Sequence, residues 1–195
     1  MLNLALFGVW RDLYVNCLAA SPLLGSRLRI LLYRSYGLTV GKHSTISPRC
    51  FIGNCHIVIG ERCFINYGCF LDNLASISIG DDCAIGMEVM LCTSTHEHGP
   101  SSRRAGVLAG KPIVIGNGCW IGARAIILPG VTIGLGSIIG AGSVVSKDCE
   151  PNGLYCGSPA QLVRKLIFHP EELKSASPCI GEDNYLQDRY IGSGD

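Results

Sequence analysis

An aliphatic residue returns at every sixth position along most of this 195-residue chain. Fifteen such hexads cover residues 40–57, 59–76, 79–96 and 115–150, and Ile, Leu or Val opens each of them. Gly takes the second position in nine hexads, and the fifth position is mostly Ser, Thr, Ala, Val or Cys, with His56 as the exception. Neither the period of a helix nor the two-residue period of an ordinary strand explains this spacing.

The hexad predicts a β-solenoid, in which each repeat forms one short flat strand and one turn. The aliphatic side chain would point inward and stack on its counterpart in the next coil. Gly permits a tight bend because it lacks a Cβ, and the fifth residue must be small because it also points into a narrow interior. Three hexads would close one triangular coil. The sequence therefore predicts about five coils, which exceeds the roughly three repeats that such a stack needs.

The cysteine content fits the same repeat. Six of the 11 cysteines stand at the fifth position of a hexad: Cys50, Cys63, Cys69, Cys83, Cys119 and Cys149. A free cysteine acts there as a compact hydrophobe. The other five, at positions 17, 55, 92, 156 and 179, follow no metal-binding spacing such as C-x-x-C. We therefore expect packing rather than disulfides or zinc, and thiols that are mostly unreactive in the native state.

Charge and hydropathy exclude several classes of protein. The formal net charge is +1, whereas nucleic-acid-binding domains carry a basic footprint. No run reaches the ~18 consecutive apolar residues of a membrane span. Residues 1–10 are apolar, but no basic stretch precedes them and no clear cleavage site follows, so a cleaved signal peptide is not expected. These features favour a cytoplasmic protein.

The flanks of the repeat predict a three-part organisation. Residues 1–39 form an N-terminal helical cap, because the segment 28–38 has apolar residues at helical spacing and ends near Gly37. A cap would cover the open edge of the first coil. The Arg residues of this helix leave peripheral membrane contact open, although it is not expected. Residues 40–150 form the solenoid with a loop at 97–114, and residues 151–195 form an exit segment and a loosely ordered tail.

The repeat resembles the hexapeptide-repeat acyltransferases over residues 40–166. The fold of that family is a left-handed parallel β-helix, and the resemblance, not the periodicity, implies the handedness. We therefore expect an all-β fold: a left-handed parallel β-helix of about five triangular coils with a helical cap, one long excursion loop and a C-terminal tail. The family also implies a homotrimer with its sites between subunits, and flat, weakly charged solenoid faces suit such packing.

The excursion at 97–114 interrupts an otherwise regular solenoid, and long loops on rigid scaffolds often carry function. Residues 92–122 resemble the sugar O-acetyltransferase branch of the family, which includes maltose and galactoside acetyltransferases. That branch has a catalytic His after a Thr-containing strand, an Arg-bearing loop, a Pro, and then aliphatic-Gly-Asn-x-x-Trp-Ile-Gly. The matching residues here are His96, Arg103 or Arg104, Pro112, and residues 115–122.

The resemblance implies that His96 is the catalytic base. A neutral imidazole suits acyl transfer near neutral pH. His96 would remove the proton of an acceptor hydroxyl, the oxygen would attack the acetyl thioester without an acyl-enzyme, and His96 would then protonate the CoA sulfur. Two alternatives remain: His98 is the base, or His96 is only a polar residue at the edge of a loop.

Residues for the acceptor and for acetyl-CoA also follow from the resemblance. Asn66 matches an Asn that contacts the acceptor sugar, while Asp72 is spaced differently from the family's acidic residue, and turn formation is an alternative role for both. Trp120 lines the site or packs at a subunit contact, and Arg103 completes the acceptor set. The expected acetyl-CoA residues are Gly122, Ala123, Ala141, Ser146, Lys147 and Arg164. Lys147 and Arg164 would neutralise phosphates, or are simply solvated.

These features predict an acetyl-CoA-dependent O-acetyltransferase acting on a sugar or glycan intermediate, with no metal and no nucleic-acid partner. Other acceptors remain open: an antibiotic, the hydroxyl of an amino acid, or an amino sugar. A non-catalytic scaffold is a further alternative. A γ-class carbonic anhydrase needs three His ligands, and the five His residues of this chain offer no suitably spaced trio beside the long loop.

Overall fold

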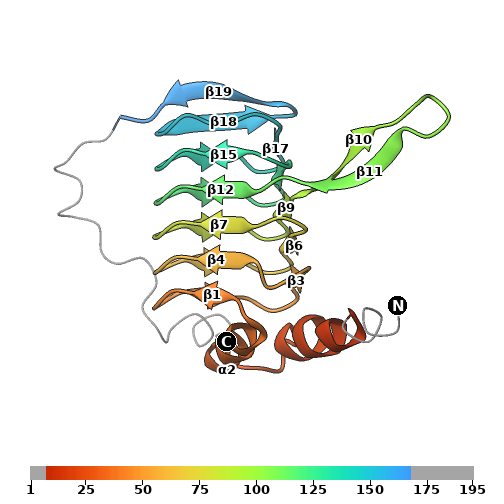
Figure 1. Ribbon diagram of the computed structural model, residues 1–195. Coiled ribbons are helices and arrows are strands. Elements are labelled where there is room, and N and C mark those ends of the chain that lie inside the picture. The colour runs from red at the N-terminus through yellow and green to blue at the C-terminus, as the bar shows by residue number, and fades with distance from the viewer. Residues whose placement is uncertain (1–7, 168–195) are drawn as a thin grey trace, which may run out of the picture.

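The computed structural model describes residues 8–167, which form a β-solenoid standing on a helical cap (Figure 1). The solenoid strands are two or three residues long: β1 (Thr39–Val40), β2 (Thr45–Ile46), β3 (Phe51–Ile52), β4 (Ile57–Ile59), β5 (Phe64–Ile65), β6 (Phe70–Asp72), β7 (Ile77–Ile79), β8 (Ala84–Ile85), β9 (Met90–Cys92), β12 (Ile113–Ile115), β13 (Trp120–Ile121), β14 (Ile126–Ile127), β15 (Thr132–Ile133), β16 (Ile138–Ile139) and β17 (Val144–Val145).

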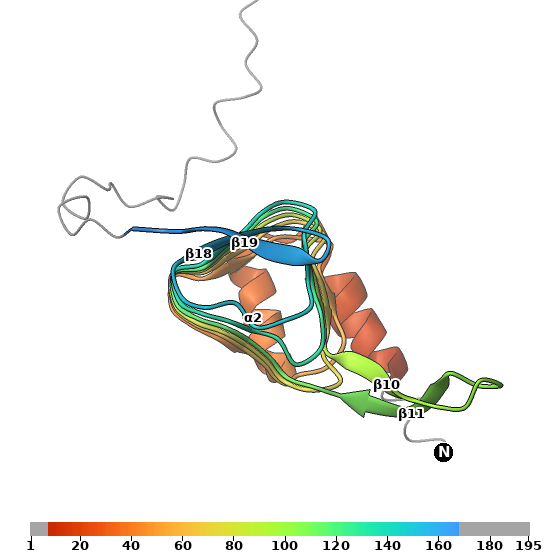
Figure 2. The same cartoon turned by 90° about the horizontal axis from the view of Figure 1, so that it is seen from above.

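These strands form three parallel sheets, which are the faces of a triangular prism (Figure 2). Face A has the order β1-β4-β7-β12-β15, face B contains β2-β5-β8-β13-β16, and face C has the order β3-β6-β9-β14-β17. On face B, β18 (Gly153–Gly157) adds in parallel to β16 and begins a sixth turn. The predicted solenoid of about five coils with a helical cap is therefore confirmed.

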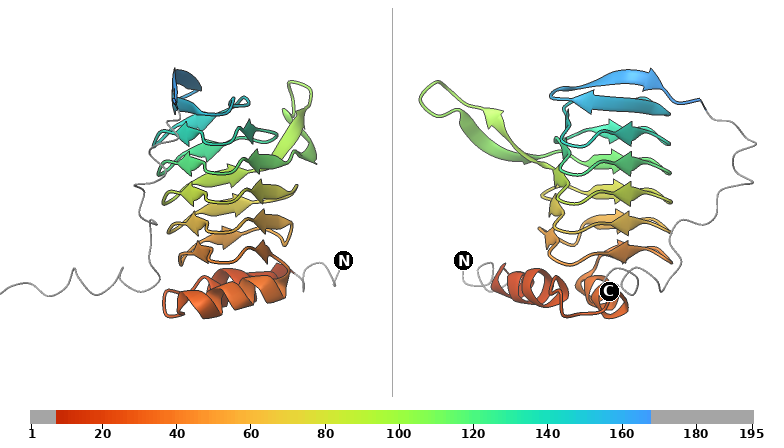
Figure 3. Two further views of the ribbon diagram at one scale, coloured as in Figure 1. Left: turned by 90° about the vertical axis from the view of Figure 1, so that its left-hand side faces the viewer. Right: turned by 180° about the vertical axis from the view of Figure 1, so that it is seen from behind.

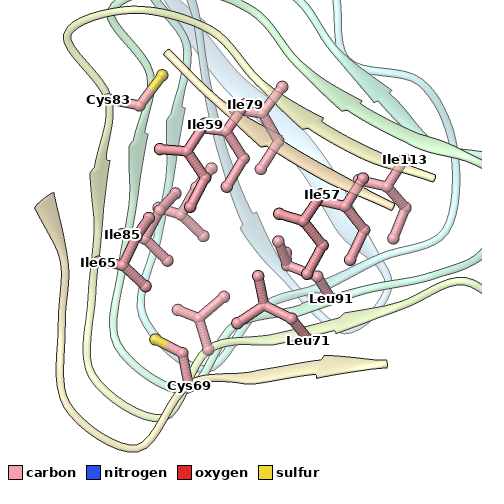
Figure 4. Packing of buried hydrophobic residues seen from close by; sticks show 14 of the residues in the cluster. Ile57, Ile59, Ile65, Cys69, Leu71, Ile79, Cys83, Ile85, Leu91 and Ile113 are labelled. Carbon is pink, nitrogen blue, oxygen red and sulfur yellow. The ribbon is translucent and has the colours of Figure 1, made fainter. Parts of the chain in front are cut away.

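The aliphatic first positions form the core. All fifteen are buried, and equivalent residues of successive coils stack within the prism, as Ile59 does on Ile79 and Leu71 on Leu91 (Figure 4). Burial of one such side chain contributes about 1.5–3 kcal/mol. The six-residue period therefore reflects an unbroken column of buried aliphatic side chains along each face of the prism.

The fifth positions supply hydrogen-bond donors as well as small volume. The thiols of Cys63, Cys83 and Cys119 donate to the carbonyl oxygens of Gly80, Gly116 and Gly134, at 2.9, 3.1 and 3.2 Å. The hydroxyl of Ser44 donates to the Gly60 carbonyl in the same way, at 2.7 Å. Each acceptor lies in the turn of the next coil. The repeat thus selects small side chains that satisfy the carbonyl group of a neighbouring turn.

The corner between faces C and A departs from the repeat. His56 is exposed there, and Asn73 and Thr93 are buried instead of the fifth-position residues Ala75 and Thr95. Asn73 accepts from the Asn54 amide and donates to its carbonyl, whereas Thr93 donates to the Asp72 carbonyl and accepts from the amide of Ala75. Extra residues follow these hexads, so the side chain that points inward at this corner is no longer that of the fifth residue of the hexad.

The cap consists of a helical segment that begins at residue 8 and continues as η1 (Asp12–Ala19), followed by α2 (Ser26–Tyr36). The cap supplies hydrogen-bond partners to the exposed backbone groups of the first strand in each face. Arg34 donates to the Val40 carbonyl of β1, and the buried Arg29 donates to the Ile46 carbonyl of β2. The Asn16 amide bonds both the N–H and the carbonyl of Ile52 in β3. The three edges are thereby closed.

The excursion expected as a loop is mostly an antiparallel hairpin, β10 (Ser94–His98) and β11 (Ala105–Gly110), which projects from the corner between faces C and A (Figures 1 and 3). At the far end, β18 turns back as β19 (Ala160–Lys165). The predicted tail beyond residue 167 lies outside the described residues. Within residues 8–167, no helix has the length and apolar character needed to cross a membrane.

We predict that Arg29→Met lowers the free energy of unfolding by about 2–5 kcal/mol, because it leaves four buried or half-buried carbonyl groups without their donor. Urea unfolding followed by circular dichroism measures the change. Arg27→Met, at an exposed position of the same helix, is the matched control and should shift stability by less than about 0.5 kcal/mol. Equal stabilities for the two variants would contradict the assigned edge-closing role.

We predict that the six fifth-position cysteines resist a thiol reagent in native buffer, whereas the exposed Cys17 reacts quickly. The six side chains are 1–5% exposed, and burial raises the pKa of Cys149 to about 11, so its reactive thiolate is scarce at neutral pH. Labelling followed by mass spectrometry with and without denaturant measures this. Rapid native labelling of all eleven cysteines would contradict the packing.

Candidate active site

His96 lies in β10, near the root of the projecting hairpin, with an exposed side chain. Its Nδ1 atom is 3.1 Å from the Gly106 carbonyl oxygen of β11. A carbonyl oxygen can only accept, so Nδ1 carries the proton and donates it. In the neutral form of the ring, Nε2 is then the nitrogen without a proton. This tautomer is the one that a general base requires.

The hairpin backbone is irregular beside His96. The pairing of β10 with β11 shifts register between His96 and His98: Gly106 and Val107 of β11 lie opposite Glu97 alone, so the bulge is on β11. A Cβ at Gly106 would lie 2.7 Å from the Glu97 carbonyl oxygen, so this close approach requires glycine. Bulges re-aim side chains. His96 and His98 lie on either side of the bulge and therefore have different backbone surroundings, although both side chains are exposed.

The root of the hairpin is fastened to the solenoid by Asp72. This residue ends β6 and is paired in register with Cys92 of β9. Its Oδ2 atom accepts a short hydrogen bond from the Ser94 hydroxyl and a 3.4 Å contact from the Cys92 thiol. Burial raises the pKa of that thiol. One carboxylate oxygen of the expected acceptor residue is thus engaged in holding β10, two residues before His96.

Sequence reasoning did not single out Ser94 or the Gly106 carbonyl. The signals were weak: a Ser within a Ser/Thr-rich stretch and one of several glycines in the excursion. Both acquire their significance from cross-strand contacts, which depend on how the hairpin folds back.

The corner between faces B and C holds another set of expected residues. The amide N–H groups of Asn66, Gly86 and Gly122 donate to carbonyl oxygens at the ends of β8, β13 and β16, which places them in one column. A Cβ at Gly86 would lie 2.6 Å from the Ala123 nitrogen, and one at Gly122 would lie 2.5 Å from the Ala141 nitrogen. At Gly86 and Gly122 this column, which we call the strip, therefore has no room for a Cβ, because the next coil lies so close.

The side chain of Asn66 bonds locally, since its Oδ1 accepts from the Tyr67 amide at 2.8 Å. This is the turn contact that the sequence left as an alternative. It also orients the amide, because Nδ2 is left as the outward donor.

The expected site residues therefore fall into two half-sites on opposite edges of face C. The hairpin corner carries Asp72, His96, Arg103, Ser146 and Lys147, and the strip corner carries Asn66, Gly122, Ala123 and Ala141. The two corners are joined by a strand and its turns, a span of about 15–20 Å. A single chain does not bring the two groups together.

Trp120 and Arg164 lie on face B. Trp120 projects from β13 between Ala84 and Ile138 and is 55% exposed, two residues before the strip. Arg164 is exposed on β19, opposite Leu154. Arg103 is exposed at the turn of the hairpin. These three residues therefore meet neither His96 nor one another within the chain.

No group of three or more His, Cys, Asp or Glu residues in the described part of the chain is arranged to hold a metal ion. Two shallow hollows, of about 430 and 370 Å³, lie at the helical cap and are not lined by His96. The candidate residues thus sit on an open surface of the chain.

Residues 112–147 match the repeat described as bacterial transferase hexapeptide (six repeats), and residues 56–92 match the hexapeptide repeat of succinyl-transferase. The galactoside O-acetyltransferase of Escherichia coli is 36% identical over 129 residues, 66% of this chain and 64% of that protein. Nodulation protein L of Rhizobium meliloti is 38% identical over 157 residues, 80% and 83% of the two chains.

A hexapeptide-repeat acetyltransferase from Vibrio cholerae, solved in complex with acetyl coenzyme A, superposes with a TM-score of 0.76 at 31% identity, covering 85% of this chain and 90% of that one. The chain therefore belongs to the hexapeptide-repeat acetyltransferase family. It spans less than two thirds of the length of the galactoside enzyme.

Proposed function

We propose that the protein is an acetyl-CoA-dependent O-acetyltransferase of the sugar-acetyltransferase type, with His96 as its general base. The observation that carries this proposal is the contact between Nδ1 of His96 and the Gly106 carbonyl, which leaves Nε2 free to accept a proton. The similarity to a galactoside O-acetyltransferase supports the type of acceptor. The acetyl-CoA complex of a relative supports the donor.

Acetyl-CoA supplies the acetyl thioester. Nε2 of His96 accepts the proton of the acceptor hydroxyl as its oxygen bonds to the acetyl carbonyl carbon. His96 then returns the proton to the sulfur as the tetrahedral oxyanion collapses and the C–S bond breaks, which releases the acetyl ester and the free thiol of CoA. Asp72 and Ser94 hold the root of β10 and thereby keep the imidazole in position. Arg103 and the outward Nδ2 of Asn66 would orient the acceptor.

The strip of small residues fits the pantetheine arm of CoA. A side chain at Gly86 or Gly122 would collide with the next coil, so the corner stays smooth, and Ala123 and Ala141 add only methyl groups. Lys147 and Arg164 are exposed cations that would pair with the phosphates. Ser146, beside Lys147, would contact the same ligand.

The two half-sites meet if the hairpin corner of one copy lies against the strip corner of the next. Such a head-to-tail contact between identical triangular prisms closes as a cyclic trimer. The outer surface of face C, between the two corners, is apolar in every coil: Phe51, Phe70, Met90, Ile126 and Val144 follow one another in register. The Phe51 and Phe70 rings stack at 4.4 Å. An apolar face of this kind suits a subunit contact.

We predict that His96→Ala lowers kcat/KM about 10²- to 10⁴-fold, the usual contribution of a general base. A thiol-release assay with acetyl-CoA and a panel of sugars, amino sugars, hydroxyl amino acids and antibiotics measures the rate and selects the acceptor. His98→Ala is the matched control on the same strand and should stay within a few-fold of wild type. Full activity of His96→Ala, or no release with any acceptor, would overturn the proposal.

We predict that two inactive variants complement each other. Ala141→Trp blocks the strip and His96→Ala removes the base, so a mixed assembly contains some interfaces at which both half-sites are intact. Random mixing in equal amounts should restore about a quarter of wild-type sites. Co-refolding followed by the thiol-release assay measures the recovery. A site contained within one chain would give no recovery.

A further inference from the structure

The helical cap exposes a set of large apolar side chains to solvent. They are Val9 (58% exposed), Trp10 (67%), Leu13 (57%), Leu18 (47%), Leu23 (92%), Leu28 (47%) and Leu31 (61%). The opposite side of the same helices is buried against the core through Val15, Ala19, Ile30 and Tyr33. The two helices lie across the end of the prism opposite to β18 and β19 (Figure 1). The cap is therefore apolar on both sides.

This end of the chain is also basic. Residues 1–60 contain six Lys or Arg and one acidic residue, Asp12, whereas residues 61–195 contain ten Lys or Arg and fourteen Asp or Glu. On α2, the exposed Arg27 lies on the same side of the helix as Leu28 and Leu31. Residues 61–167 carry eight Lys or Arg and eight Asp or Glu, so the excess of positive charge within the described residues lies at the cap end.

We propose that the cap is a peripheral membrane-binding surface, which lies on a bilayer that contains anionic lipids. Helices of this type insert an apolar face with Trp and Leu into the headgroup region while basic side chains contact lipid phosphates. Each basic residue near an anionic surface strengthens binding about fivefold. The sequence left peripheral membrane contact open, and the exposed side of the cap is the surface that would make this contact.

The charge pattern favours an anionic surface over a second copy of the cap. Two caps in a symmetric contact would bring Arg27 of one copy toward Arg27 of the other, and like charges would repel. In the cyclic trimer proposed above, by contrast, all three caps would face the same side and bind one bilayer together, which raises the overall affinity.

Docking at the cap would also set the height of the hairpin. Strand β9, from which the hairpin leaves, is two strand spacings from β3 in face C, or about 10 Å. The cap helices add about another 10 Å, so His96 would stand roughly 20 Å above the bilayer surface, within reach of a hydroxyl only on a molecule that extends that far from the bilayer. Membrane binding itself does not depend on the catalytic proposal.

Co-sedimentation of the full chain with lipid vesicles tests the proposal. We expect binding to vesicles of phosphatidylcholine mixed with phosphatidylglycerol, weaker binding to phosphatidylcholine alone, and loss of the difference at high salt. Leu28→Ser combined with Leu31→Ser should weaken binding roughly tenfold, and Arg27→Glu at least fivefold. Leu135→Ser is the matched control, since Leu135 is 55% exposed on the solenoid, away from the cap.

Thermal unfolding of each variant verifies that the exposed substitutions leave the fold intact. A loss of vesicle binding is then due to the changed side chains on the cap surface. Absence of sedimentation with both vesicle types would overturn the proposal. Equal binding of the Leu28→Ser/Leu31→Ser variant and wild type would overturn it as well. A change of molar mass in light scattering for that variant, without vesicle binding by wild type, would instead assign the cap to a contact between copies.

Discussion

The close, in-register stacking of coils is the constraint on which the rest of the structure depends. Parallel strands lie about 4.8 Å apart, so turns approach so closely that a Cβ at Gly122 would lie 2.5 Å from the next coil. The same proximity lets a fifth-position thiol such as that of Cys63 reach a carbonyl oxygen one coil away. Stacking also leaves open strand edges at the first coil, which explains why Arg29, buried without a carboxylate partner in the described residues, donates to backbone carbonyls.

Stacking also aligns the residues of successive coils in a column at each corner of the prism. Candidate functional residues therefore lie together when they share a corner, whatever their separation in the sequence. Asn66 and Gly122 are far apart along the chain and lie on one corner, while His96 falls on another. The hairpin that carries His96 leaves the solenoid where the repeat is irregular, because only there does the chain add residues without breaking a stack. Two half-sites separated by an apolar face are the result, and a neighbouring copy is the simplest way to unite them.

Much of this could be predicted from the repeat. The hexads predicted the solenoid, the buried aliphatic columns and the buried position of cysteines such as Cys63 and Cys83, because six residues make one strand and one turn wherever they occur. The family resemblance pointed to His96. The repeat failed at Asn73 and Thr93, which are buried in place of the expected residues, and it did not reveal the bond between Asp72 and Ser94. Those contacts join residues about twenty positions apart, and the extra residues between coils decide which side chains meet.

The sequence by itself determined that this chain forms a solenoid and which side chains point inward, because the inward direction depends only on a local period of six. Tertiary structure decided which corner each residue occupies, because that depends on the accumulated number of residues in every preceding coil. It therefore separated His96 from the strip at Gly122, and it gathered Trp10, Arg27 and Leu31 on one end of the prism. The helical pattern of residues 28–38 predicted a cap, but only its packing on the first coil revealed that an apolar and basic face remains outward.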